Sequence, residues 1–326
     1  MSEFKKRSLY DIYFKMTLEE VVDYYQQLRK EQLKNNDLVR GIQIRKALYR
    51  VVKVILMLDA LMTKRKVTIL NDDRKYTLDY STLTKDEYIN YNSDYKKHPK
   101  IYTATHIGRY DCESVVQSIN ENTNILMSDP GVSYKDIDGI MLRLMGVTWF
   151  DHENKLDRKY ANLRETEVLK QGGSCLLFPE AGYCIDPIVP VGEIHPGFAK
   201  RAINTKAHIV PVSLEQYEDN NVKNYVVNIG NTILTDNTSS EEAEDLSFFV
   251  RDEMRRLKKE IWSIYGGAKP TKEEFENDPL SLDKYKERID FMMRDVPSYY
   301  RVTNIVKELY KPSDVAIKSL KDISYL

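Results

Sequence analysis

A histidine and an aspartate five residues apart could together form a general base. They are His106 and Asp111, in the segment Thr105-His-Ile-Gly-Arg-Tyr-Asp111. A histidine can take a proton from a hydroxyl group when a carboxylate holds its second ring nitrogen and stabilises the imidazolium that forms. In the alternative interpretation, Asp111 is the N-cap of a helix and His106 is a surface loop residue.

The same spacing occurs a second time in the chain. His152-Glu-Asn-Lys-Leu-Asp157 repeats it, so spacing alone does not choose between the two histidines.

A second segment combines an apolar strand with an acid at its end. Leu176-Leu-Phe-Pro-Glu-Ala-Gly182 is an apolar run that Pro179 stops, with Glu180 directly behind it. Chemistry in open α/β sheets gathers where strands end, so this position favours a functional acid. The alternative is that Glu180 is an ordinary acid in a turn.

Several segments, in this order, resemble the motifs of the PlsC-like glycerophospholipid acyltransferases, the lysophosphatidic acid acyltransferase family. The first motif of that family is His-x4-Asp, and its third begins Phe-Pro-Glu. The further matches are Gly146-Val-Thr-Trp-Phe-Asp151 for the second motif, Pro196-Gly-Phe-Ala-Lys-Arg-Ala for the helix before the fourth, and Ile209-Val-Pro211-Val-Ser for the fourth. The resemblance covers residues 95–262. It also selects His106, because the family places its catalytic histidine upstream of the second motif, whereas His152 lies inside that motif.

The resemblance implies transfer of a fatty acyl group from a thioester, acyl-CoA or acyl carrier protein, to a hydroxyl of a lipid-like acceptor. His106 would deprotonate the hydroxyl, and Asp111 would orient the imidazole ring, without an acyl-enzyme. No metal and no cofactor is expected, since the acyl donor is a co-substrate. The substrate-binding positions implied by the motifs are Arg109, Gly146, His152, Phe178, Pro179, Glu180, Gly182 and Pro211.

The chain departs from the family pattern at positions that would bind the acceptor substrate. Thr105 stands where the family has Asn, and His152 stands where its second motif ends in Arg. Ala181, Gly182 and Tyr183 replace the Gly-Thr-Arg of the third motif. A guanidinium binds phosphate through two parallel hydrogen bonds, so the loss of two arginines argues against a plain lysophosphatidate acceptor.

Three functions therefore stay open. The first is phospholipid acylation, with charge supplied from a new direction by Arg109, Arg143, Arg158, Lys200 or Arg201. The second is acylation of a sugar or other non-phosphate hydroxyl. The third is a catalytically reduced relative that binds lipid or a protein partner. The chain has no Gly-x-Ser-x-Gly, phosphate-binding glycine loop or His-Glu-x-x-His, which counts against a serine hydrolase, a nucleotidase and a zinc peptidase.

An alternation of strands and helices must position these residues. It predicts an α/β fold, a mixed sheet flanked by helices, with N-terminal helices and a helical C-terminal extension. Strands are expected at 66–70, 76–80, 101–105, 174–178, 208–214 and 225–229, and helices at 9–35, 111–120, 160–170, 198–204 and 239–265. We expect an N-terminal helical segment 1–36, an acyltransferase domain 37–265 with its motifs in 95–262, and an extension 266–326.

Composition limits the remaining classes. The chain has 326 residues, 49 basic against 50 acidic side chains, 42% hydrophobic and 30% charged residues. These values argue against an integral membrane protein, a disordered chain and bulk nucleic-acid binding. Three cysteines without a CxxC pair predict neither a disulfide framework nor a zinc site. The charged N-terminus does not read as a secretory signal, which predicts a cytoplasmic protein.

The segment 44–66 has the pattern of a basic amphipathic helix. Its apolar positions are Ile44, Leu48, Val51, Val52, Ile55, Leu58 and Met62, and its basic ones Lys46, Arg50, Lys53 and Lys64. One interpretation packs the apolar stripe on the domain core. The other lays the helix in a membrane interface, as a peripheral contact at the inner face of the membrane, although Asp59 close to the stripe weakens this case. The oligomeric state is not predicted.

Overall fold

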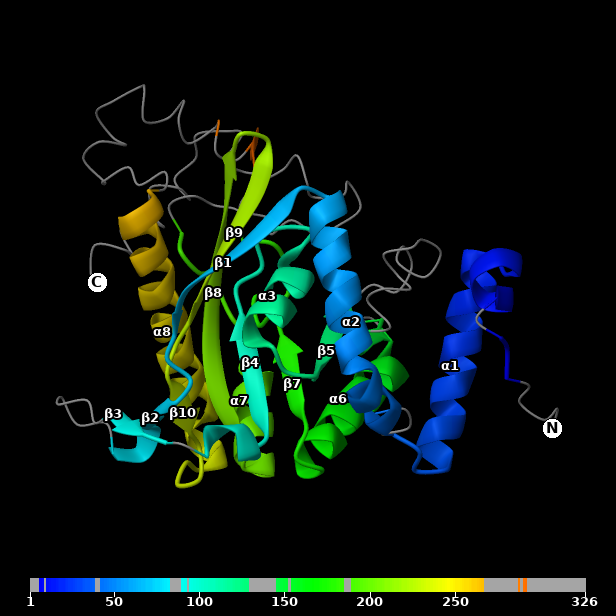
Figure 1. Cartoon of the computed structure of the whole chain (residues 1–326). Helices are drawn as coiled ribbons and strands as arrows, with labels where there is room; N and C mark the ends of the chain where they lie inside the picture. Colours follow the sequence, from blue (N-terminus) through cyan, green and yellow to red (C-terminus); the bar gives the residue numbers. More distant parts are fainter. Residues whose placement is uncertain are drawn as a thin grey trace, which may run out of the picture.

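The strands of this protein form one mixed sheet with helices on both faces (Figure 1). The computed structural model describes residues 6–8, 10–38, 42–82, 89–92, 94–128, 145–151, 154–184, 189–266, 287 and 290–291. The described strands are β1 Arg65–Asp72, β2 Tyr76–Asp79, β3 Ile89–Tyr91, β4 Lys100–Ala104, β5 Thr123–Ser128, β6 Val147–Phe150, β7 Ser174–Leu177, β8 His208–Asp219, β9 Val222–Ile229 and β10 Thr232–Leu234. The predicted α/β class with a mixed sheet is confirmed.

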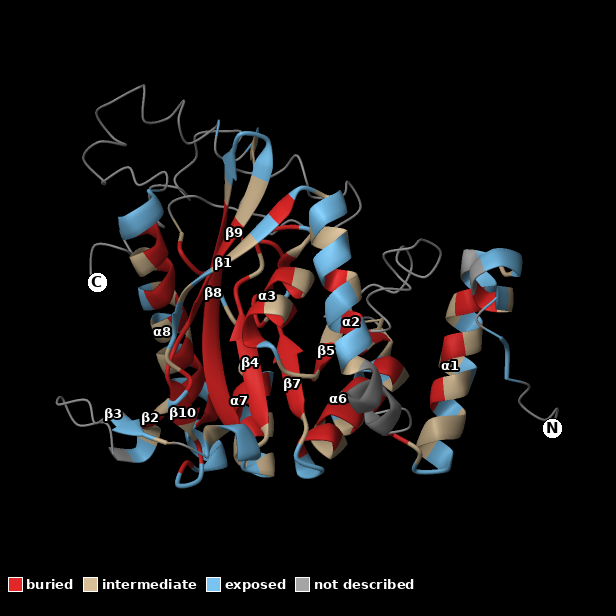
Figure 2. Ribbon diagram, in the orientation of Figure 1, coloured by how far each residue is buried: buried red, intermediate tan, exposed pale blue. Residues whose placement is uncertain are grey.

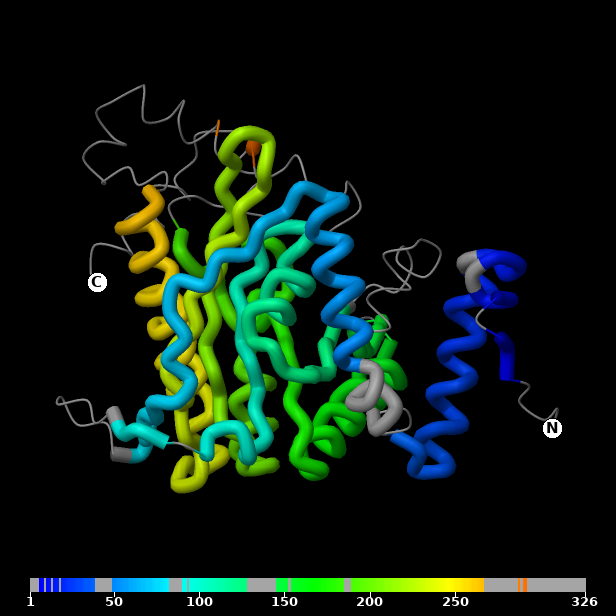
Figure 3. The backbone as a smooth tube through the Cα atoms, in the orientation of Figure 1, coloured from blue at the N-terminus to red at the C-terminus, as the bar shows by residue number. Residues whose placement is uncertain are grey.

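The strand order is β3-β2-β10-β8-β4-β7-β5-β6, with β9 also on β8 and β1 beside β9. The five strands from β8 to β6 run parallel to one another. β8 also pairs antiparallel with β9, and β1 pairs parallel with β9 although the two lie far apart in the chain (Figure 3).

The central strands are buried on both faces, as Figure 2 shows. Every residue of β4 is buried, including the polar Lys100 and Thr103, since a parallel strand between two helical layers meets no water. Thr103 of β4 stands beside Leu177 of β7. The segments that follow these two strands, with His106 and with Glu180, therefore leave the sheet side by side.

Two helical layers cover the sheet. The described helices are α1 Leu18–Lys34, α2 Ile42–Met62, α3 Asp111–Ile119, α6 Lys155–Lys170, α7 Gly197–Thr205 and α8 Ala243–Tyr265. α1, α2 and α3 share one apolar core with Tyr102 and Ala104 of β4, whereas α6, α7 and α8 share another with Ile101. This division follows from the alternation of side chains along the strand.

α1 begins at a capping box, because Thr17 Oγ1 accepts the Glu20 N–H while Glu20 Oε2 accepts the Thr17 N–H. The helix predicted over 9–35 is confirmed from Leu18 to Lys34, and a short π-helical turn, Asp11–Lys15, precedes it. The buried Arg29 of α1 pairs with Asp157 of α6 and donates to the carbonyl of Trp149. α1 is therefore held on the sheet through α6, while the predicted division at residue 36 stays a prediction.

The helix predicted over 44–66 ends earlier than expected. α2 stops at Met62, Lys64 takes a φ of 51°, and Arg65 and Lys66 already belong to β1. The interpretation that packs its apolar stripe on the core is wrong in part. Of that stripe, Val52 faces the core, whereas Val51, Leu58 and Met62 are exposed.

Other boundaries moved for local reasons. α6 starts at Lys155 instead of 160, because Asn154 Oδ1 accepts the N–H groups of Leu156 and Asp157 as an N-cap. β3, β5, β6 and β10 were not expected from the sequence, and β8 continues five residues past Leu214. Of the predicted extension 266–326, all but residues 266, 287 and 290–291 lie outside the described residues.

Candidate functional site

The loop after β4 is fixed to the neighbouring strand before it reaches His106. Thr105 Oγ1 accepts the Leu214 N–H at 3.0 Å and donates to the Leu214 carbonyl at 3.4 Å. Thr105, which replaces the expected Asn, is fully buried. It thus aligns the end of β4 with β8.

His106 and Asp111 are in direct contact. The distance from His106 Nδ1 to Asp111 Oδ2 is 2.9 Å, and the His106 side chain is 15% exposed while that of Asp111 is fully buried. An ionised carboxylate only accepts hydrogen bonds, so this contact places the proton on Nδ1 and leaves the lone pair of Nε2 for a substrate.

Asp111 also shapes the loop between the two residues. Its Oδ2 accepts the N–H groups of Ile107 at 2.5 Å and Gly108 at 2.9 Å. Asp111 is the first residue of α3, and the N-cap is Tyr110, which makes no side-chain cap. The interpretation of Asp111 as a simple N-cap is therefore wrong, although the helix dipole still favours a carboxylate there.

Glu180 holds the backbone of the same loop. Its Oε1 accepts the His106 N–H at 3.2 Å, and its Oε2 accepts the Gly192 N–H at 3.0 Å. The Cys184 N–H donates to the His106 carbonyl at 2.6 Å, so a second backbone bond fixes His106. Burial raises the pKa of Glu180, and the two amide hydrogen bonds oppose that shift. Glu180 is thus a buried positioning acid rather than an ordinary acid in a turn.

Two aromatic rings pack on the imidazole. The ring centre of His106 lies 4.5 Å from that of Phe178 and 3.9 Å from that of Tyr183. Tyr183, which replaces the third-motif Arg, is 3% exposed. These contacts restrict rotation of the imidazole. The role of Tyr183 was missed, since nothing in the sequence shows that this side chain turns back onto His106.

The turn after Pro179 is strained at one position. Ala181 has a φ of 53°, which side chains other than glycine rarely adopt, and its N–H donates to the Phe178 carbonyl at 3.1 Å. Gly182 is buried, and the carbonyl of Pro179 accepts the His195 N–H at 3.0 Å.

Two other predicted substrate-binding residues are placed away from His106. Gly146 precedes β6, level with Ile101, and β7 and β5 stand between β6 and β4, a sideways distance of about 14 Å. Pro211 lies within β8 beside Thr103, and its carbonyl accepts the Gly230 N–H. His152 and Arg143 lie outside the described residues.

Positive side chains gather on the ring of Tyr110, next to Asp111. The exposed Arg109 lies 5.5 Å from the ring centre, Lys223 lies 5.8 Å away, and the buried Arg65 lies 4.5 Å away. Arg65 was missed because it follows α2, far from any motif. Arg201, another candidate cation, instead pairs with the buried carboxylate of Glu165.

Three amides of the loop are already used. The N–H groups of His106, Ile107 and Gly108 bind carboxylates, so an oxyanion formed in this site would need a donor other than these three. Within the described residues, His, Cys, Asp and Glu side chains form no group of three that could hold a metal ion. In the same part of the chain, no helix is long and apolar enough to cross a membrane.

Comparison with known proteins gives one match. Residues 82–215 match the protein-family model described as Acyltransferase, a span that includes His106, Asp111 and Glu180. The match supports acyl transfer as the general chemistry, with an acyl donor and a hydroxyl acceptor. A search of curated proteins found no significant match.

Proposed function

We propose that this protein transfers a fatty acyl group from a thioester to a hydroxyl of a lipid-like acceptor, as an O-acyltransferase of the glycerophospholipid acyltransferase type. The observation that carries the proposal is the 2.9 Å contact between His106 Nδ1 and the buried Asp111, at the carboxyl end of a parallel strand inside the matched domain. The contact leaves one ring nitrogen, Nε2, to act as a base.

In the proposed reaction, His106 Nε2 takes the proton of the acceptor hydroxyl as its oxygen attacks the thioester carbonyl. The tetrahedral intermediate then expels the thiolate, and the carbon–sulfur bond breaks. The imidazolium returns the proton to the thiolate sulfur, which restores the neutral histidine. Asp111 stabilises the imidazolium, and Glu180 with Phe178 and Tyr183 holds the ring in place.

The nature of the acceptor has two candidate answers. A phosphate-bearing lipid would place the protein in phospholipid biosynthesis, with Arg109 as the exposed cation of the loop. One observation favours a sugar or another non-phosphate hydroxyl. Tyr183 fills the position of the expected phosphate-binding Arg, and its buried ring lies 3.9 Å from that of His106.

The donor in this proposal is a co-substrate, acyl-CoA or acyl carrier protein, and the reaction as written uses no cofactor and no metal. We place the enzyme in the cytoplasm, at the inner face of a membrane, because that is where a lipid acceptor is available to it.

The test measures thioester consumption by wild type and His106→Ala with a panel of lipid and sugar acceptors, and identifies the acylated product by mass spectrometry. We expect the variant to lose at least about 10²-fold in turnover. His195→Ala, at an exposed histidine, is the control and should keep wild-type turnover. Equal turnover by wild type and His106→Ala would contradict the assignment of His106 as the catalytic base. Binding of vesicles or a protein partner without acyl transfer to any acceptor would replace the enzyme with a catalytically reduced relative.

A further inference from the structure

One side of α2 exposes apolar side chains that the fold does not cover. The exposed fractions are 53% for Val51, 52% for Val54, 55% for Met57, 49% for Leu58, 69% for Leu61 and 78% for Met62. We call these six residues the α2 face. The helix is nevertheless anchored, since Val52 and Leu56 are buried and the Leu56 carbonyl accepts a hydrogen bond from Gln117 of α3.

The α2 face is continuous. At 100° per residue, its six side chains fall within an arc of about 140° around the helix axis. Ile69 of β1, which follows α2 in the chain, is also 46% exposed. Scattered exposed apolar residues are ordinary, but a contiguous set of this kind marks a contact surface.

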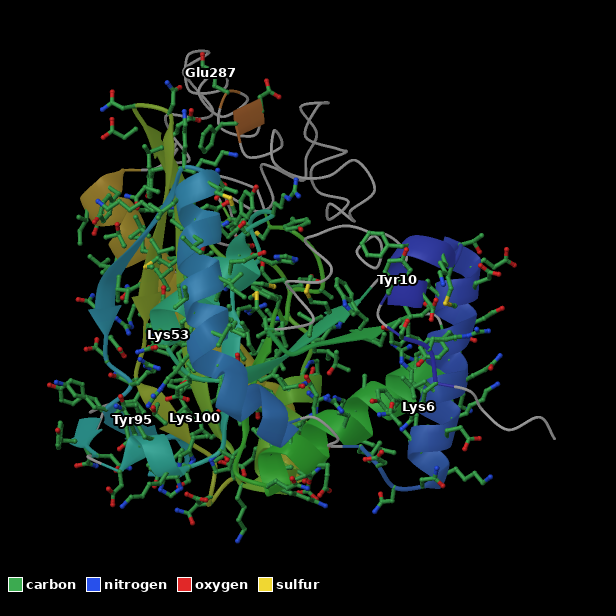
Figure 4. The ribbon with its side chains drawn as sticks, turned by 45° about the vertical axis from the view of Figure 1, so that its right-hand side comes forward. Lys6, Tyr10, Lys53, Tyr95, Lys100 and Glu287 are labelled. Carbon is green, nitrogen blue, oxygen red and sulfur yellow. The ribbon has the colours of Figure 1, made fainter. Side chains whose placement is uncertain are left out.

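The exposed charged side chains that the structure describes on α2 and at the start of β1 are basic. Arg50, Lys53, Lys64 and Lys66 are exposed on α2 and at the start of β1, and Figure 4 labels Lys53 on the helix. The acid of α2, Asp59, pairs with the buried Arg65 at 2.7 Å, so its charge is compensated within the protein. A surface of this composition is attracted to anionic groups.

An apolar arc edged by cations suits the interface of an anionic bilayer. The apolar side chains enter the acyl boundary, and the lysines meet the negative headgroups. A second copy of this chain suits the same surface poorly, because a two-fold interface would place the same basic surface on both sides. The pattern therefore favours lipid over self-association.

The α2 face also ends beside the candidate site. Arg65, three residues after Met62, stands 4.5 Å from the ring centre of Tyr110, and Tyr110 directly precedes Asp111. The most exposed apolar residues, Leu61 and Met62, are thus at the end of α2 that leads to the His106 loop. A bilayer bound here would lie next to the place where a lipid hydroxyl must reach His106.

We infer that the α2 face, with its flanking cations, docks the protein on an anionic lipid bilayer. The inference rests on the proposed function only for its purpose, the delivery of a lipid acceptor. Docking itself requires no turnover.

The test is co-sedimentation of the full chain with vesicles of phosphatidylcholine alone or mixed equally with phosphatidylglycerol. We expect wild type to bind the mixed vesicles. The double variant Leu61→Gln, Met62→Gln should bind them at least about tenfold more weakly, because each substitution removes an exposed apolar group from the interface. Lys53→Gln with Lys64→Gln should weaken binding by about fivefold per charge at low salt.

The matched control is Phe248→Gln with Ile264→Gln on α8, where the exposed fractions are 43% and 63%. It should bind within about twofold of wild type. Equal binding by all variants would overturn the inference. So would a wild-type dimer in light scattering that the Leu61→Gln, Met62→Gln variant loses.

Turnover separates this inference from the proposed function. With a short-chain acceptor dissolved in water, the Leu61→Gln, Met62→Gln variant should turn over within about twofold of wild type while its vesicle binding falls. A deficit of tenfold or more with the dissolved acceptor would count against a docking role. If wild type binds anionic vesicles in the expected order of variants but acylates nothing, the proposed function fails and the docking face stands.

Discussion

The two ends of the parallel strands both hold buried carboxylates and cations, yet they use them in different ways. At the carboxyl end, Asp111 and Glu180 accept hydrogen bonds mainly from backbone N–H groups. Asp111 also contacts a side chain that stays partly exposed, the ring of His106. At the amino end, the charged groups bind mainly one another.

The amino-end cluster consists of Arg74, Lys100, Tyr102 and Glu121, close to the first residue of β4. Arg74 donates to the Ile119 carbonyl at 2.7 Å and to Tyr102 at 3.3 Å, and Glu121 lies 3.7 Å from Arg74 and 3.5 Å from Lys100. Figure 4 labels Lys100 beside Tyr95, whose ring lies 5.6 Å from the ammonium group.

The pKa shifts of this cluster follow from its burial and from the charged groups around it. Burial lowers the pKa of Lys100, and the charge of Glu121 opposes it. Burial is likewise the largest influence on the pKa of Arg74 and lowers it, but the hydrogen bonds and charges of Asp72 and Tyr102 together outweigh burial and leave the pKa above its usual value. A catalytic pair therefore differs from a structural cluster in one respect that can be tested: one member keeps a nitrogen accessible to substrate.

The largest effect is expected from Asp111→Asn. An amide oxygen can still accept the loop N–H groups, so the fold should survive, but the charge that stabilises the imidazolium is lost. We expect turnover to fall by about 10²- to 10⁴-fold, with the KM for the thioester changed by less than about threefold. Steady-state kinetics of thioester consumption measure both.

Asp157→Asn is the matched control for this change. Asp157 is also buried and also accepts a backbone N–H, that of Asp151 at 3.1 Å, but its cation is the structural Arg29. It should lower the free energy of unfolding and leave the turnover of the folded protein within about twofold. If both variants lose turnover equally, the distinction between the two kinds of carboxylate is wrong.

Arg74→Met breaks the amino-end cluster. It removes one of the two cations near Glu121 and leaves the Ile119 carbonyl and Tyr102 without their donor, so we expect the free energy of unfolding to fall by about 3 kcal/mol. Denaturant titration measures this loss. Turnover of the folded fraction should stay within about twofold, and a selective loss of turnover at unchanged stability would place this cluster in the function instead.

The sequence predicts the carboxyl end better than the amino end, for a physical reason. His106 and Asp111 meet through a local turn, and Phe178 follows an apolar strand, so short segments encode both. Parallel pairing then brings them together by the ordinary rule for strand ends. Arg74 and Glu121, by contrast, are 47 residues apart in the chain, and no local sequence pattern predicts that they lie close together.

The positions that the sequence missed share this property. Tyr183 packs on His106 only because Ala181 turns the chain back, and Arg65 reaches Tyr110 only because β1 pairs with β9. The strand β6 was missed because its four residues are too few to show a period. The placement of α2 stayed open between two interpretations, because an apolar stripe predicts a contact without saying with what.

His208 gives a smaller effect, on the pH dependence of stability. It begins β8 at the amino end, faces Asp236, His98 and Lys100, and has its pKa lowered first by burial. A histidine with a folded-state pKa below its unfolded value of 6.5 contributes full stability above that pH and loses it as the pH falls, because the unfolded chain binds the proton first.

We therefore expect wild type to lose stability below about pH 6.5 more steeply than His208→Gln, by at most about 1.4 kcal/mol per pH unit. Denaturant titrations from pH 5 to pH 8 measure the difference. Above about pH 7.5 the two proteins should differ by a constant amount. Parallel curves over the whole range would show that His208 does not contribute this share.

The smallest effect compares backbone strain at the two ends. Ala181, in the turn that carries Tyr183, has a φ of 53°, and Asn120, the C-cap of α3 beside the amino-end cluster, has a φ of 51°. Asparagine tolerates this conformation, whereas alanine is strained in it by about 1–2 kcal/mol. Ala181→Gly should relieve the strain at an entropic cost in the unfolded chain, for a net gain of about 0.5–1 kcal/mol in the free energy of unfolding. Asn120→Gly should gain less stability or none.

Thermal and denaturant unfolding measure which variant gains more stability. A loss of stability in Ala181→Gly would mean that its methyl group contributes packing that outweighs the strain. If the gain comes with a loss of turnover beyond about threefold, the strained turn itself holds Tyr183 against His106, since a freer backbone would then let the ring leave the imidazole.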